Sequence, residues 1–86
     1  MKVGIAGSVE SNDVLITVQS ADELIIEITS IVDAFFHDQI EKVIIDTLKE
    51  NKINKVKVIC QDKGALDYTI KARLVTALAR MEEQHA

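Results

Sequence analysis

The chain has 86 residues and a formal net charge of −4 at pH 7, a length that suits one domain with a single core. Hydrophobic residues make up 48% of it, charged residues 28%, and Pro is absent, which is typical of a folded globular domain. The longest apolar runs are far shorter than the roughly 20 residues of a membrane-spanning helix. Gly4, Gly7 and Glu10 interrupt the first segment before a signal-peptide core forms. We therefore expect a cytoplasmic protein without a membrane partner, with one domain over residues 1–86.

Charge and residue types exclude further classes of function. Residues 1–43 carry two Lys against eight Asp or Glu, whereas residues 44–86 carry eight Lys or Arg against six. An acidic chain with one Tyr, two Phe and no Trp lacks the basic surface and stacking platforms of most nucleic-acid binders. Cys60 is the single cysteine, so no intrachain disulfide forms and no paired Cys/His metal spacing exists. We expect neither nucleic acid nor metal.

The first half of the chain predicts three strands. A short apolar stretch over residues 3–9 ends at the turn-forming residues 10–13. Apolar residues then alternate over 14–18 and again over 24–28, which is typical of half-buried strands. The short link between these two stretches predicts an antiparallel hairpin.

The second half predicts two helices around one more strand. Ser30 followed by Asp33 resembles a capping box, so we expect a helix from about residue 31 to 50. Its apolar stripe comprises Val32, Phe36, Ile40, Val43, Ile44 and Leu48. Residues 56–60 alternate again, and a second helix follows from about residue 65, with Asp62 available as its cap.

The element order is therefore strand, strand, strand, helix, strand, helix. A strand–helix–strand crossover normally sets its two strands parallel and is right-handed. We predict an α+β two-layer sandwich, with a mixed, mainly antiparallel sheet and both helices on one face.

Few residues are candidates for catalysis, and no pair of them forms a catalytic motif. His37 beside Asp38 is typical of a surface histidine, His85 lies in the charged tail, and Cys60 is expected to be a small buried hydrophobe. Gly4 and Gly7 complete neither a dinucleotide fingerprint nor a phosphate loop and are expected to mark a bend or bulge. We therefore predict no catalytic residue.

Two separated motifs resemble one known family. Residues 6–14, Ala-Gly-Ser-Val-Glu-Ser-Asn-Asp-Val, closely resemble the amino-terminal motif of the citrate lyase acyl carrier proteins, the gamma subunits of citrate lyase. Residues 62–67, Asp-Lys-Gly-Ala-Leu-Asp, with the helical segments 70–74 and 77–80, resemble that family's carboxy-terminal signature. The resemblance covers nearly the whole chain.

This resemblance implies a role as a carrier. Ser11, the serine after Glu10, would hold 2′-(5″-phosphoribosyl)-3′-dephospho-CoA through a phosphodiester. The thiol of that group would bear the acetyl or citryl group while citrate is cleaved to oxaloacetate and acetate. The implied partners are the alpha (acyl transferase) and beta (lyase) subunits of citrate lyase and a prosthetic-group transferase, so the chain alone would not be an enzyme.

Other residues are candidates for contacts with the arm or with partners. Lys63 and Gly64 would dock a phosphate at the start of the second helix, or form only a cap and a tight turn. Arg73, with Arg80 on the same helix face, would meet an acidic partner, although solvation explains both arginines nearly as well. Like charges at residues 10 and 13 would hold an anionic arm out in water.

Two alternatives remain open at this point. The chain would also suit a related complex with the same arm, such as citramalate lyase or malonate decarboxylase. In a different class, it would be a protein-interaction module whose hairpin edge pairs with a partner strand.

Overall fold

The computed structural model describes residues 1–31 and 33–83 and confirms the predicted order of elements. The strands and helices are β1 (Val3–Gly7), β2 (Val14–Ser20), β3 (Ile25–Ser30), α1 (Asp33–Glu50), β4 (Val56–Asp62) and α2 (Asp67–Glu82). Val32 of the predicted helix stripe and His85 lie outside the described residues. Neither helix in the described part of the chain is long and apolar enough to cross a lipid bilayer.

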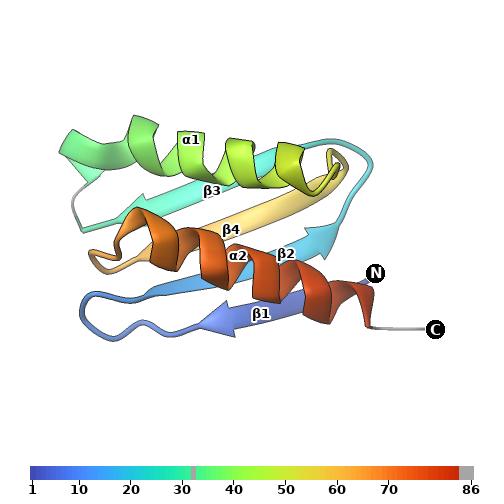
Figure 1. Cartoon of the computed structure of the whole chain (residues 1–86), viewed down its shortest axis with the longest axis horizontal. Helices are drawn as coiled ribbons and strands as arrows, with labels where there is room; N and C mark the ends of the chain where they lie inside the picture. The colour runs from blue at the N-terminus through green and yellow to red at the C-terminus, as the bar shows by residue number, and fades with distance from the viewer. Residues whose placement is uncertain (32, 84–86) are drawn as a thin grey trace.

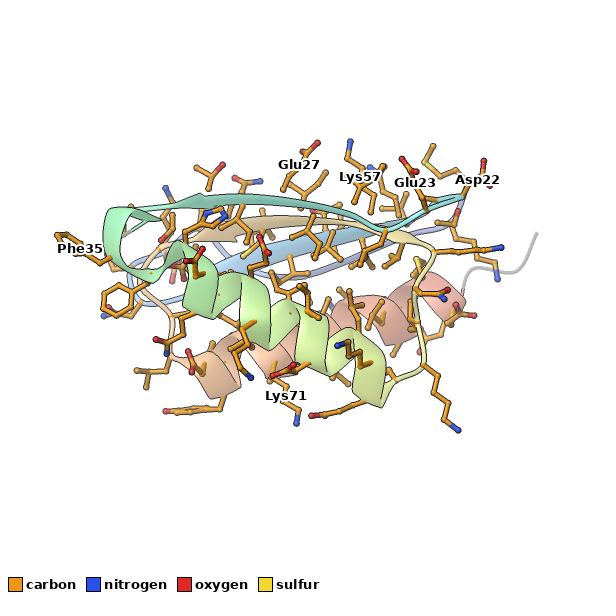
Figure 2. All side chains as sticks on the ribbon, turned by 90° about the horizontal axis from the view of Figure 1, so that it is seen from above. Asp22, Glu23, Glu27, Phe35, Lys57 and Lys71 are labelled. Atoms are coloured by element: carbon orange, nitrogen blue, oxygen red, sulfur yellow. The ribbon has the colours of Figure 1, made fainter. Side chains whose placement is uncertain are left out.

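The four strands form one sheet in the order β1-β2-β4-β3 (Figure 1). The pairs β1–β2 and β2–β4 are antiparallel, and the pair β3–β4 is parallel. Both helices cover the same face of the sheet, while Glu27 and Lys57 point away from them on the other face (Figure 2). The predicted two-layer sandwich with a mixed, mainly antiparallel sheet is confirmed.

The predicted hairpin between the second and third strands is wrong, because β4 lies between them. The four residues that separate β2 from β3 reach about 13 Å when extended. The link must span two strand spacings of roughly 4.8 Å each, so it is long enough to pass over β4. The inner place beside β2 goes to β4, whose alternate residues Val56, Val58 and Cys60 are completely buried. The hairpin of this sheet is instead β1–β2.

The core lies between the sheet and the helices. Its fully buried side chains come from alternate positions of β2 and β4 and from one stripe of each helix, as the sequence periodicity predicts. They include Val14, Ile16, Val18, Ile44, Leu48, Ile70 and Leu74. The predicted burial of Cys60 is confirmed, and burial together with the charge of Asp62 raises the pKa of its thiol to about 12.

The two helices begin slightly later than expected. Ser30 is the last residue of β3, and its hydroxyl donates a hydrogen bond to Asp62 Oδ2 at 2.8 Å. The side chain of Asp33 lies outside the described part, so the capping box stays a prediction. Leu66 occupies the N-cap position of α2 without a side-chain cap. The carboxylate of Asp62 instead accepts the amide of Ala65 at 2.9 Å, one residue before that cap.

The two glycines of β1 have different roles. Gly7 has a φ of +95°, and a Cβ there would lie 1.8 Å from the carbonyl oxygen of Val14, so it forms the bend that the sequence predicts. Gly4 is not a bend: a Cβ at this position would lie 1.9 Å from the carbonyl oxygen of Ala77. Its missing side chain lets α2 pack directly on the backbone of β1.

Candidate functional site

The predicted site residues meet at one end of the molecule. Because β4 runs antiparallel to β2 and parallel to β3, the β1–β2 turn lies at the same end of the sheet as the starts of both helices (Figure 1). We call this region the Ser11 end. It comprises the turn (residues 8–13), the first turns of α1 (33–40) and the β4–α2 loop with the start of α2 (63–68).

Ser11 lies at the tip of the β1–β2 turn, as predicted. The amide of Asp13 donates to the carbonyl oxygen of Glu10 at 3.1 Å, which closes a four-residue turn with Ser11 at its second position. Asn12, at the third position, has a φ of +66°, a conformation that Asn tolerates better than most residues. Ser11 is exposed and takes no part in the hydrogen bonds that hold the turn.

The carboxylate of Asp13 holds the turn from inside. It accepts the hydroxyl of Ser8 and the amide of Val14, each at 2.7 Å. Arg73 on α2 adds an ion pair, with Nε at 3.2 Å from Oδ1. The hydroxyl of Ser8 is the largest of these influences, and together they lower the pKa of Asp13 below its ordinary value. Asp13 is therefore an anion paired with Arg73, and repulsion of an anionic arm by Glu10 and Asp13 stays a prediction.

The β4–α2 loop fixes the other side of the turn. The amide of Asn12 donates to the carbonyl oxygen of Lys63 at 2.8 Å, and the amide of Lys63 donates to that of Asp13 at 2.9 Å. Gly64 follows with a φ of +92°, so this segment forms the tight turn that was the alternative to a docking site. Docking of the arm by Lys63 or Gly64 stays a prediction.

The two arginines of α2 are engaged with the sheet. Arg73 binds Asp13, and Nη1 of Arg80 donates to the carbonyl oxygen of Ile5 at 2.7 Å. Both therefore fasten α2 to β1 and its turn, 60 and 75 residues away in sequence. These pairs were not predictable from the sequence, because the spacing of the arginines shows only that they share a helix face.

A groove of about 500 Å³ lies beside the turn, between α1 and the start of α2. Its walls are formed by Phe36, Gln39, Ile40, Asp62, Gly64, Ala65, Leu66, Asp67 and Tyr68. Nε2 of Gln39 donates to Asp67 Oδ2 at 2.9 Å across it. Sequence reasoning missed this groove, although the chain's three aromatic residues fall in segments 35–36 and 68. Figure 2 shows Phe35 projecting outward at this end.

Among the described residues, the remaining candidates give no catalytic arrangement. His37 is half-exposed on α1 with Nε2 3.6 Å from Glu41 one turn later, and Cys60 is buried. Within residues 1–31 and 33–83 no cluster of three or more His, Cys, Asp or Glu side chains is placed to hold a metal ion. What the Ser11 end offers is an exposed hydroxyl on a rigid turn.

Comparison with known proteins agrees with this geometry. The sequence profile described as malonate decarboxylase delta subunit matches residues 1–81. The citrate lyase acyl carrier protein of Oenococcus oeni is 46% identical over 84 residues, covering 96% of this chain and 87% of that protein. That of Haemophilus influenzae strain PittEE is 43% identical over 83 residues, with the same coverage. The chain belongs to the citrate lyase acyl carrier protein family.

Structural similarity extends the comparison to the fold. A chain in the crystal structure of a Pseudomonas malonate decarboxylase hetero-tetramer in complex with malonate superposes with a TM-score of 0.80. The match covers 93% of this chain and 84% of that chain at 16% identity, so it shows the fold alone. The predicted family and architecture of this acyl carrier are thus both confirmed.

Proposed function

We propose that this chain is the acyl carrier subunit of a citrate lyase complex and that Ser11 is its attachment residue. The observation that carries the proposal is the exposed Ser11 hydroxyl at the tip of a turn held by Asp13, Arg73 and Lys63. The family resemblance names 2′-(5″-phosphoribosyl)-3′-dephospho-CoA as the group esterified there. The partners would be the acyl transferase and lyase subunits and, in the cytoplasm, the transferase that attaches the group.

The residues present fit such a group. An enzyme that forms a phosphodiester must reach the hydroxyl, and an exposed turn offers it without disturbing the core. Ser8, the other serine of the turn, donates its hydroxyl to Asp13 at 2.7 Å and is already engaged. Ser11 is therefore the serine of this turn that is available for modification.

The rest of the turn determines how the attached group is held. When bound, the group supplies a thiol that carries an acyl thioester at the end of a long arm. The chain's contribution is a fixed anchor, because the Ser8–Asp13–Arg73 contacts and the backbone bonds to Lys63 leave the turn little freedom. Tethering to such an anchor keeps the thiol at a high effective concentration near the partner active sites.

Mass spectrometry tests this assignment. Intact-mass and peptide analysis of the protein from its native host should show one adduct of the phosphoribosyl-dephospho-CoA group, located on Ser11. In loading assays with the prosthetic-group transferase, Ser11→Ala should stay unmodified while Ser8→Ala is still loaded. An active native complex whose Ser11 is unmodified would overturn the proposal.

A carrier role in malonate decarboxylase is the second candidate, because the matching family profile and the similar solved structure both bear that enzyme's name. The identities of 46% and 43% to citrate lyase carriers, against 16% to the malonate decarboxylase chain, favour citrate lyase. Loaded protein should restore citrate cleavage to a citrate lyase complex depleted of its carrier. Restoration of malonate decarboxylation alone would favour the second candidate.

A further inference from the structure

The groove between α1 and α2 is close to Ser11. Gly64 lines the groove, and a Cβ on Gly64 would lie 3.6 Å from the side-chain oxygen of Asn12. A backbone hydrogen bond joins the amide of Asn12 to the carbonyl oxygen of Lys63, the residue before Gly64. The path from the Cα atom of Ser11 through Asn12 and Lys63 to Gly64 is about 13 Å long. The groove therefore begins no more than this distance from Ser11.

The walls of the groove suit a flat apolar occupant. Phe36, Leu66 and Tyr68 are 47%, 59% and 72% exposed in spite of their apolar surfaces, and aromatic and aliphatic side chains of this kind stack readily on the faces of nucleobases. Gln39 and Asp67 are bonded to each other through Gln39 Nε2, and the side-chain oxygen of Gln39 can still accept a hydrogen bond from the edge of a base.

Charge decides which part of a nucleotide the groove can take. Among the described residues that line it, the polar side chains include the carboxylates of Asp62 and Asp67 but no Lys or Arg. Phosphate groups and the carboxylates of an acyl load would therefore be repelled, whereas a neutral base would not. The observed charge thus favours a base over the anionic parts of the arm.

We propose that this groove binds the adenine base of the arm attached to Ser11. This inference rests on the proposed function, since it takes the arm to be the phosphoribosyl-dephospho-CoA group. In that group the adenosine lies near the phosphodiester and the thiol lies at the far end. Adenine in the groove would fix the first part of the arm and leave the remainder free to move between partner sites.

The experiment compares loaded and unloaded protein by amide NMR and by tyrosine fluorescence. Tyr68 is the only tyrosine and Trp is absent, so the emission reports directly on the groove. Loading should shift the amide signals of Gln39 and residues 64–68 and lower the emission of Tyr68. Free adenosine monophosphate, added at equal concentration to unloaded protein, corrects for light absorbed by adenine.

A pair of matched variants separates groove binding from general effects of the arm. Leu66→Ser removes an apolar wall and should abolish both signals, while mass spectrometry still shows the arm on Ser11. Val75→Ser makes the same type of change at an exposed position of α2 outside the groove and should keep both signals.

The outcomes are distinct. Loaded protein whose signals change only around residues 8–14 would overturn the groove inference and leave the carrier role standing. Changes in the groove that occur only when partner subunits are added would also overturn it and would assign the groove to protein docking. Protein from an active native complex with no arm on Ser11 would overturn the proposed function and this inference together.

Discussion

Replacing Asp62 by Ala removes the buried carboxylate that joins the ends of β3 and β4 to the loop before α2. This side chain accepts the hydroxyl of Ser30 at 2.8 Å and the amide of Ala65 at 2.9 Å. A buried donor that loses its acceptor costs about 1–3 kcal/mol. Water can reach the Ser30 hydroxyl and the Ala65 amide, because both residues are only half-buried, so each loss should fall in the lower part of this range. We expect Asp62→Ala to lower the free energy of unfolding by about 2–4 kcal/mol.

Urea unfolding followed by far-UV circular dichroism measures this change. Asp62→Asn keeps the volume and one carbonyl acceptor, so it should lose about half as much stability as Asp62→Ala. Asp67→Ala, an exposed carboxylate on α2 that accepts the side chain of Gln39, is the matched control and should change stability by about 1 kcal/mol or less. If Asp62→Ala costs no more than Asp67→Ala, the carboxylate does not hold this loop and the reasoning is refuted.

Three further predictions concern other parts of the structure. Gly4→Ala should destabilise the protein by about 2 kcal/mol or more, since a methyl group there meets the backbone of α2; an unchanged urea midpoint would show that the helix shifts freely. Because the pKa of Asp13 is lowered on folding, its contribution to stability is present above about pH 4 and is lost as the pH falls through the folded-state pKa. In an NMR titration, Ser8→Ala and Arg73→Ala should each raise that pKa, and a variant that leaves it unchanged would contradict the assignment of its cause. Finally, Cys60, with a thiol pKa of about 12 and full burial, should react with a thiol reagent at pH 8 only after unfolding; rapid reaction of the native protein would contradict its burial.

The sequence was sufficient to predict the elements and the parallel pair, because hydrophobic periodicity and the crossover rule depend on local pattern and chirality. It was not sufficient to predict which strand pairs with β2. Residues 24–28 and 56–60 alternate in the same way, and a four-residue link fits either an adjacent hairpin or a step over one strand. The inner and the edge position differ in burial, which is complete at alternate residues of β4 and only partial along β3, and this depends on how all four strands meet the helices.

The candidate site shows the same division between local and long-range information. The turn at Ser11 was predictable from Glu10, Asn12 and Asp13, which are local turn formers. The ion pair between Asp13 and Arg73 joins residues 60 apart, so it arises only when α2 packs on β1. The groove likewise exists only because the start of α2 comes to lie beside α1.

The bond between Arg80 and Ile5 has a consequence for self-association. The amide of Ser20 donates to the carbonyl oxygen of Lys2, and carbonyls in an antiparallel pair alternate in direction, so the carbonyl of Ile5 faces the open margin of β1. An open margin of this kind is a template on which a second molecule can extend the sheet and start an aggregate. The carbonyl oxygen of Ile5 already accepts a hydrogen bond from the guanidinium of Arg80 at 2.7 Å. The same side chain that holds the last helix in place thus also obstructs the growth of β-sheet from one copy of the protein to the next.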